Sequence, residues 1–149
     1  MNTKILTKSL WLFHCSVGSC NNCDIELLDC LTPRYDVERF GMLLVGSVRH
    51  ADVIVVTGAM NIKSVPRMKK IYEQAPKPCL VVACGTCATS QGIFKCSYTM
   101  PKSLDEILPV SLYIPGCPPR PEAIIAGIVN LINRLNKPPK KERSEAKNE

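Results

Sequence analysis

Nine cysteines stand out among the 149 residues, and five of them fall into three short segments that could bind metal. Cys20 and Cys23 form one CxxC pair, and Cys84 and Cys87 form a second. Cys117 lies in a Pro-Gly-Cys-Pro-Pro segment, where the prolines fix φ and the glycine lets the chain turn. Thiolates are soft ligands, which suit both iron–sulfur clusters and zinc. The cysteines therefore predict a metal site of one of these two kinds.

The elements that position these cysteines can be predicted from the apolar runs of the chain. Five short runs, several of them rich in β-branched residues, lack strict alternation, which is typical of strands buried on both faces. They cover residues 10–14, 42–46, 53–57, 80–83 and 112–114. Helical patterns run from Pro66 to Pro76 and onward from Pro121. We therefore predict an α/β, flavodoxin-like fold, with a mostly parallel sheet of four to five strands and helices on both faces.

The predicted strands place these cysteines at one edge of the sheet. The first strand is followed by Cys20 and Cys23, the fourth by Cys84 and Cys87, and the fifth by Cys117. In open parallel sheets, ligands bind outside the carboxyl ends of the strands. Three loops that are distant in sequence are thus expected to deliver thiols to one site.

Composition excludes several classes of protein. No apolar stretch approaches the roughly 20 residues of a membrane-spanning helix. The first eight residues lack the apolar core of a secretory signal, so we expect a reducing compartment and free thiols. The net charge of +6 comes without interleaved aromatic residues, so nucleic-acid binding is not expected. Residues 1–136 are predicted to form one α/β domain, and residues 137–149 a flexible charged tail.

Zinc binding and core packing are the alternatives to an iron–sulfur cluster. Two CxxC pairs suit a structural zinc site, but roughly 60 residues separate them, against about 15–20 in zinc ribbons. A site built from these pairs also leaves the Pro-Gly-Cys-Pro-Pro segment without a function. An isolated cysteine is often a small core hydrophobe, which we expect of Cys15, Cys30, Cys79 and Cys96. A zinc-binding structural adaptor remains the alternative to an electron-transfer protein.

Motifs that extend from about residue 11 to residue 135 resemble those of a known family. They are Cys20-Asn-Asn-Cys23-Asp-Ile-Glu26, Phe40-Gly41, Arg49-His-Ala-Asp52, Gly85-Thr-Cys87-Ala and Pro115-Gly-Cys117-Pro-Pro119. This combination is similar to the small, proximal-cluster subunit of nickel–iron hydrogenases and to its relative in respiratory complex I, the 20 kDa subunit that holds cluster N2. The spaced Cys20 and Cys23, where complex I relatives have adjacent cysteines, favour the membrane-bound, energy-converting hydrogenases.

The resemblance implies a set of site residues. The ligands of one 4Fe–4S cluster are expected to be Cys20, Cys23, Cys87 and Cys117. Cys84 matches none of the family's ligands and is expected to be a packing thiol. Asp24 and Glu26 are expected to lower the cluster potential, because a nearby carboxylate disfavours added negative charge. Glu26, which belongs to the family motif, is the candidate for coupling proton uptake to electron arrival.

Three further residues carry weaker expectations. Arg49 resembles a family position near the cluster and the subunit interface, where a cation offsets cluster charge. His14, on the first strand, is expected to be a hydrogen-bonded core histidine rather than a ligand. Asn22 stands where the family commonly has glycine, and asparagine tolerates a left-handed φ.

The resemblance also implies a function and partners. The chain is expected to be an oxidoreductase subunit, inactive alone, that transfers electrons next to the nickel–iron centre of a membrane-bound, ferredoxin-linked, ion-translocating hydrogenase complex. The expected partners are the large nickel–iron subunit, a ferredoxin-like cluster subunit and membrane ion-translocating subunits. The expected location is peripheral, on the cytoplasmic side of the cell membrane. The alternative within the superfamily is the cluster subunit of a complex I-like quinone- or sulfur-reducing oxidoreductase.

Overall fold

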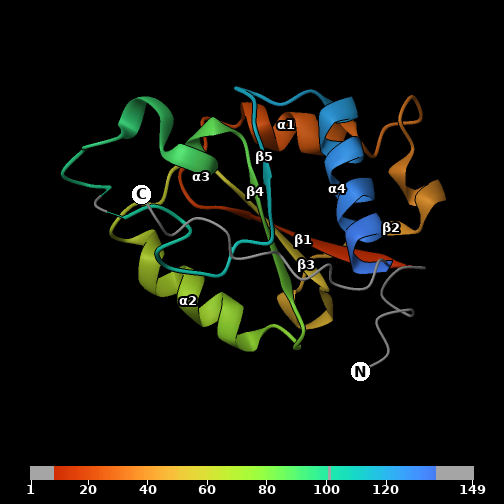
Figure 1. Cartoon of the computed structure of the whole chain (residues 1–149), viewed down its shortest axis with the longest axis horizontal. Helices are drawn as coiled ribbons and strands as arrows, with labels where there is room; N and C mark the ends of the chain where they lie inside the picture. Colours follow the sequence, from red (N-terminus) through yellow and green to blue (C-terminus); the bar gives the residue numbers. More distant parts are fainter. Residues whose placement is uncertain (1–8, 101, 137–149) are drawn as a thin grey trace, which may run out of the picture.

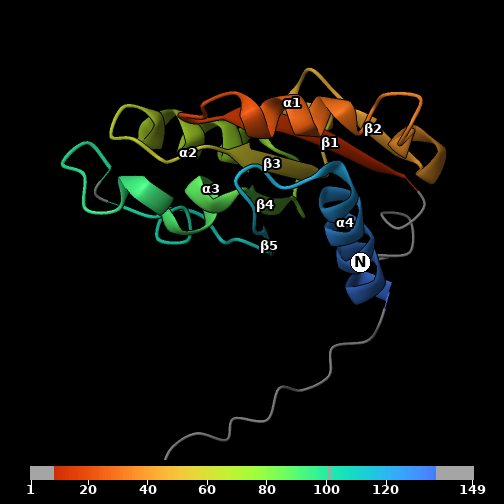
Figure 2. The same cartoon turned by 90° about the horizontal axis from the view of Figure 1, so that it is seen from above.

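Five parallel strands form the centre of the molecule (Figure 1). The computed structural model describes residues 9–100 and 102–136. The strands are β1 (Leu10–Ser16), β2 (Met42–Leu44), β3 (Val53–Thr57), β4 (Leu80–Cys84) and β5 (Leu112–Ile114). Their order across the sheet is β2-β1-β3-β4-β5, and the labels of Figure 2 follow one another in this order. This is the flavodoxin-like order, so the predicted fold class is confirmed, with a sheet that is parallel throughout.

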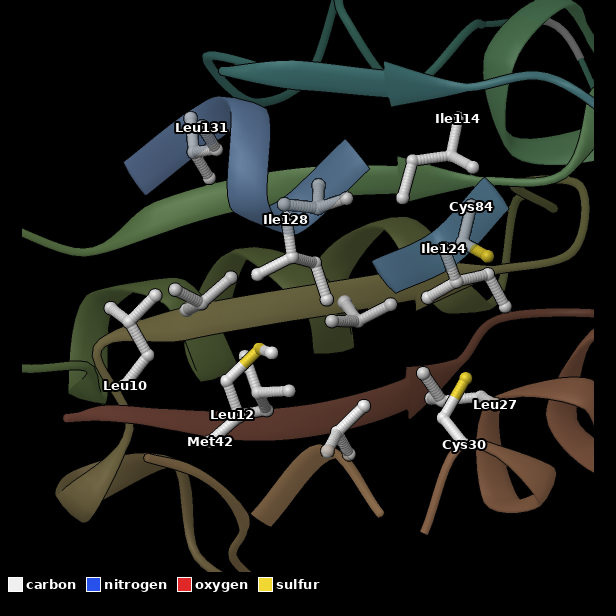
Figure 3. Packing of buried hydrophobic residues seen from close by; sticks show 14 residues of the cluster. Leu10, Leu12, Leu27, Cys30, Met42, Cys84, Ile114, Ile124, Ile128 and Leu131 are labelled. Carbon is white, nitrogen blue, oxygen red and sulfur yellow. The ribbon is translucent and has the colours of Figure 1, made fainter. Parts of the chain in front are cut away.

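The central strand β3 explains why the sheet has two apolar faces. All five of its residues are buried, and alternate side chains point to opposite faces of the sheet. Val53 and Val55 join one core cluster, and Ile54 and Val56 join the other. Figure 3 shows the first cluster, which includes strand residues such as Leu12 and helix residues such as Ile128.

Two helices cover each face of the sheet. On the face of Val53 and Val55 lie α1 (Asn22–Asp29) and α4 (Pro121–Asn136), and on the other lie α2 (Ser64–Gln74) and α3 (Thr86–Ser90). Figure 1 shows α4 and α2 on opposite sides of the strands. Short 3-10 turns complete the connections: η1 (Val37–Phe40), η2 (Val48–His50) and η3 (Gly92–Phe94). Four strands therefore end side by side at one edge, at Ser16, Thr57, Cys84 and Ile114, whereas β2 ends opposite Leu12, near the start of β1.

The predicted elements match the structure except for the start of one helix and the absence of two short helices from the prediction. The helix predicted from Pro66 begins at Ser64, because the Asn61 carbonyl and side-chain oxygens both accept a hydrogen bond from the Ser64 N–H (3.0 and 2.8 Å). The short helices α1 and α3 were not predicted as elements. The helix from Pro121 and all five strands are confirmed.

Two further expectations concern the chain ends and the membrane. The tail predicted for residues 137–149 lies outside the described residues. Within the described part, none of the helices has the length and apolar character needed to cross a bilayer.

Candidate metal centre

Three loops at the carboxyl edge of the sheet carry the four predicted ligands. Cys20 lies in the connection from β1 to α1, and Cys23 is the second residue of α1. Cys87 is the second residue of α3, directly after β4, and Cys117 lies between β5 and α4. Cys20 and Cys117 are exposed, Cys87 is half-buried and Cys23 is buried. The structure thus brings the three loops to one edge, as the strand pattern predicted.

Backbone hydrogen bonds hold the second and third loops together. The Gly85 N–H donates to the Ile114 carbonyl (2.9 Å), and the Thr86 N–H and hydroxyl donate to the Gly116 carbonyl (2.8 and 3.0 Å). Gly85 has a φ of +89°, and a Cβ added to it would lie 2.6 Å from Cys23 Sγ. Only glycine fits this position, because any side chain would displace the Cys23 thiol.

The first loop packs directly on the chain that follows β3. Gly58 has a φ of +85°, and a Cβ there would lie 2.2 Å from the Ser19 nitrogen. The Val17 carbonyl accepts hydrogen bonds from Asn61 Nδ2 (3.2 Å) and from Ser64 Oγ (2.8 Å). The chain then turns at Asn21, which has a φ of 72°. The left-handed residue is therefore Asn21 and not Asn22, which is already the first residue of α1.

The thiols of the three loops lie close enough to raise one another's pKa values. Burial raises the pKa of Cys23 to about 11, and the thiols of Cys20, Cys87 and Cys117 add to this rise. Burial also raises the pKa of Cys87, with further contributions from Cys117 and Cys20. As thiolates these groups repel one another, so binding them together requires a cationic centre such as iron or zinc ions.

The donor set fits an iron–sulfur cluster. All four groups are soft thiols, and two of them come from the second residues of helices, whose backbone is fixed. Within the described part of the chain, no three His, Cys, Asp or Glu side chains are spaced to hold one metal ion. Three separate loops that each present thiols can surround a centre of several irons, which is larger than a single ion.

Cys84 has a different environment from these four residues. It is the last residue of β4, fully buried, and it belongs to the core cluster under α1 and α4. Figure 3 shows its side chain beside Ile124, at the same end of the core as Cys30. Burial raises its pKa to about 12, and Cys23, Cys30 and Asp24 add to the rise. This position suits the packing role that the sequence predicts for Cys84.

A hydrogen-bonded group of three side chains lies directly behind the first loop. Thr57 Oγ1 donates to Asp24 Oδ1 (2.5 Å), and His14 Nε2 lies 3.0 Å from the same oxygen and 2.9 Å from Thr57 Oγ1. Because the hydroxyl hydrogen of Thr57 points to the carboxylate, Thr57 Oγ1 can also accept a hydrogen bond. An Nε2–H of His14 can therefore donate to both Thr57 Oγ1 and Asp24 Oδ1. His14 is therefore hydrogen-bonded as expected, but it is half-buried rather than in the core. Thr57 was missed, although a threonine that ends a Val-Ile-rich strand was a signal.

Glu26 lies near the cysteine loops, whereas Arg49 does not. Glu26 is half-buried, one turn after Cys23 in α1, and its carbonyl accepts a hydrogen bond from the Cys30 N–H (3.3 Å). Arg49 is exposed in η2, before the first residue of β3. Because all strands run in the same direction, η2 lies at the amino edge, away from the cysteine loops. The expectation that Arg49 lies beside the cluster is therefore wrong.

Comparisons with known proteins identify the family of this chain. A family model described as NADH ubiquinone oxidoreductase, 20 kDa subunit, matches residues 20–131. A probable membrane-bound hydrogenase subunit from Pyrococcus furiosus is 51% identical over 134 residues, which covers 90% of this chain and 80% of the relative. A subunit of the F420H2 dehydrogenase of Methanosarcina mazei is 42% identical over 127 residues, covering 85% of this chain and 67% of that relative.

A solved structure extends the likeness to three dimensions. A chain of the membrane-bound sulfane sulfur reductase, described as an archaeal respiratory membrane complex, superposes with a TM-score of 0.78 and 39% sequence identity. The superposition covers 89% of this chain and 73% of the other. The matched family region contains all four candidate ligands and most of the sheet, and the predicted iron–sulfur chemistry is consistent with it. This chain therefore belongs to the family of the 20 kDa subunit of NADH ubiquinone oxidoreductase, a family of oxidoreductase subunits.

Proposed function

We propose that this chain is the electron-transfer subunit that carries one 4Fe–4S cluster next to the nickel–iron centre of a membrane-bound, ferredoxin-linked, ion-translocating hydrogenase complex. The overall reaction is the reduction of protons to hydrogen or its reverse. The proposed ligands are Cys20, Cys23, Cys87 and Cys117. The similarity to the Pyrococcus furiosus hydrogenase subunit over 90% of the chain supports the hydrogenase assignment.

The observation that carries the proposal is the convergence of three cysteine loops at one edge of the sheet. Gly85, two residues before Cys87, lies against Cys23 Sγ of the first loop, and its N–H donates to Ile114, three residues before Cys117. A 4Fe–4S cluster held by four thiolates exchanges one electron at a time. Cys20 and Cys117 are exposed at the edge of the molecule, which keeps the site close to neighbouring redox centres.

The proposed partners follow from this exposed edge. The large subunit with the nickel–iron centre is expected to cover the loops of Cys20, Cys87 and Cys117. Exposed apolar side chains near these loops suit such a permanent interface: Ile25 is 60% exposed, Leu28 52% and Ile93 90%. A ferredoxin-like cluster subunit would deliver or remove electrons. Membrane subunits would translocate ions and hold this chain peripherally on the cytoplasmic side.

A second candidate function is the cluster subunit of a complex I-like quinone- or sulfur-reducing oxidoreductase. The 39% identity to a chain of the membrane-bound sulfane sulfur reductase favours this alternative. The two functions share the same cluster and differ in the catalytic partner. Nickel analysis of the purified complex therefore separates them.

Metal and sulfide analysis tests the proposal. Anaerobically purified complex is expected to contain about four irons and four inorganic sulfides for this chain, beyond those of the other cluster subunits, with visible absorption that bleaches on reduction. When the chain is expressed alone and reconstituted with iron and sulfide, the same analysis gives its iron and sulfide content without a contribution from other subunits. One zinc and no sulfide would instead show that the chain is a zinc-binding structural adaptor. Nickel in the complex supports the hydrogenase, whereas its absence supports the second candidate.

We also propose Glu26 as the group that couples proton uptake to reduction of the site. Its support is its half-buried position one turn after Cys23. Glu26→Gln is expected to weaken the pH dependence of the midpoint potential while the iron content stays unchanged. Asp29→Asn, an exposed change in the same helix, is the control. Equal pH dependence in wild type and both variants would contradict the role of Glu26.

A further inference from the structure

A large hollow lies beside the loop of Cys20, on the α2 side of the sheet. Its volume is about 620 Å³, and its walls are residues 61–64, Arg67 and residues 99–100. The Ile62 N–H donates to the Thr99 carbonyl (3.0 Å), which joins the two walls. The hollow is therefore built by two segments that are fixed to each other.

The hollow is basic. Among the residues that the structure describes, Lys63 and Arg67 line it and no acidic side chain does. Both cations are exposed, and among the residues that the structure describes, no carboxylate lies within ion-pair distance of either. Lys70, also exposed, follows Arg67 on the same helical face, because residues three and four apart are neighbours on a helix. A row of positive charge thus runs from the hollow along α2.

The wall of the hollow contacts the cysteine loop. Asn61 Nδ2 and Ser64 Oγ both donate to the Val17 carbonyl, three residues before Cys20. Ser19, the residue next to Cys20, packs against Gly58. A molecule seated in the hollow therefore lies close to an exposed candidate ligand.

The positive charge of the hollow indicates which kind of molecule can bind in it. The chain's own residues 137–149 hold five basic and three acidic residues, and a second copy carries a net charge of +6, so both are repelled. A membrane surface is broad and flat, which does not suit a hollow of this volume. A polypeptide segment with carboxylates fits the cations, and an apolar side chain on it fits Ile62, which is 56% exposed.

We propose that this hollow docks an acidic segment of the subunit that exchanges electrons with this chain. The assignment rests on the proposed electron-transfer function and adds the surface through which electrons enter. The apolar surface near Ile25 and Ile93 suits the permanent contact with the large subunit. The basic hollow suits a contact in which complementary charge sets orientation and association rate.

Zero-length cross-linking in the purified native complex tests the proposal. A carbodiimide joins a lysine amine to a carboxylate that it touches, and the Lys63 amine is exposed in this chain. The expected product joins Lys63 to an aspartate or glutamate of a subunit with further iron–sulfur clusters. A Lys63 product with the large subunit or a membrane subunit, or no product at Lys63, would overturn the proposal.

Charge reversal provides the matched comparison. The K63E/R67E complex is expected to lose that cluster subunit in a salt wash that wild type survives. K69E/K77E makes the same charge change at two exposed lysines outside the hollow and is expected to behave as wild type. Equal losses from both double variants would refute the docking site. So would binding of wild type, but not K63E/R67E, to anionic phospholipid vesicles.

Iron and sulfide content separates this inference from the function on which it rests. Both double variants are expected to keep the wild-type iron and sulfide content of this chain, because neither change touches a cysteine loop. Wild-type chain without iron or sulfide would refute the proposed function. A normal cluster with no cross-link at Lys63 would refute the docking site alone.

Discussion

The two CxxC pairs of this chain have the same spacing and different structures. In the first pair, Cys20 lies in an irregular loop and Cys23 in the first turn of α1, so both thiols approach the site. In the second pair, Cys84 is still part of β4 and its side chain enters the core. Cys87 lies beyond the strand, in α3, where its nearest thiols are those of Cys117 and Cys20. The same spacing therefore places both members of the first pair outside the sheet, and divides the second pair between the core and the loop.

The largest expected effect comes from replacing each cysteine of the second pair in turn. Cys87→Ser is expected to lose or convert the cluster, because a hydroxyl is a hard and poor substitute for a thiolate. Cys84→Ser is expected to keep it. Iron and sulfide content and the electron paramagnetic resonance spectrum of the reduced protein measure both. Cluster loss in Cys84→Ser together with an intact cluster in Cys87→Ser would reverse the assignment.

The glycine between the two members of the second pair is the next point to test. Gly85→Ala places a Cβ against Cys23 Sγ and forces a residue with a side chain to adopt a φ of +89°. We expect a loss of about 1–3 kcal/mol in the free energy of unfolding and a reduced cluster content. Gly46→Ala is the control, because its Cβ would meet no atom within 4 Å. Similar losses in both variants would show that the contact with Cys23 is unimportant.

A similar loss of stability, but without loss of cluster content, is expected from the packing role of Cys84. In Cys84→Ser, a hydroxyl replaces a thiol in a fully buried apolar environment, which costs about 1–3 kcal/mol if the hydroxyl finds no partner. Denaturant unfolding of the apo chain measures this loss. Cys96→Ser is the exposed control and should change stability by no more than about 0.5 kcal/mol. An unchanged Cys84→Ser midpoint would mean that this site is not a tightly packed core position.

The smallest expected effect concerns the residues that support the first pair. Thr57→Val removes the hydroxyl that contacts Asp24 and His14 but keeps the shape of the side chain. We expect a loss of about 0.5–1.5 kcal/mol, since a similar volume remains and one hydrogen-bonding group is lost. Cluster content should stay near wild type. Complete loss of the cluster in this variant would mean that Thr57 determines the loop conformation rather than supporting it.

The sheet and its cysteine edge could be predicted because buried parallel strands leave continuous apolar runs in the sequence. The same signal fails for α1 and α3, which have eight and five residues, too few to establish a helical period. Arg49 was misplaced because its position was taken from the family resemblance, although it precedes the strand predicted at residues 53–57 and therefore belongs to the amino edge of a parallel sheet. Thr57 was missed because its partners, Asp24 and His14, come from two other elements. Contacts of this kind need coordinates.

The separation of the ligands along the sequence has a consequence for biosynthesis. Cys20 leaves the ribosome long before Cys117, which follows β5, the last of the described strands. The loop of Cys117 is fixed by the pairing of β5 with β4 and by the hydrogen bonds that Gly85 and Thr86 donate to Ile114 and Gly116. A cluster held by all four proposed ligands would therefore be inserted after β5 has been synthesised, and the first three thiols would have to stay reduced until then. The proteins that deliver such a cluster would recognise a folded precursor rather than a nascent chain.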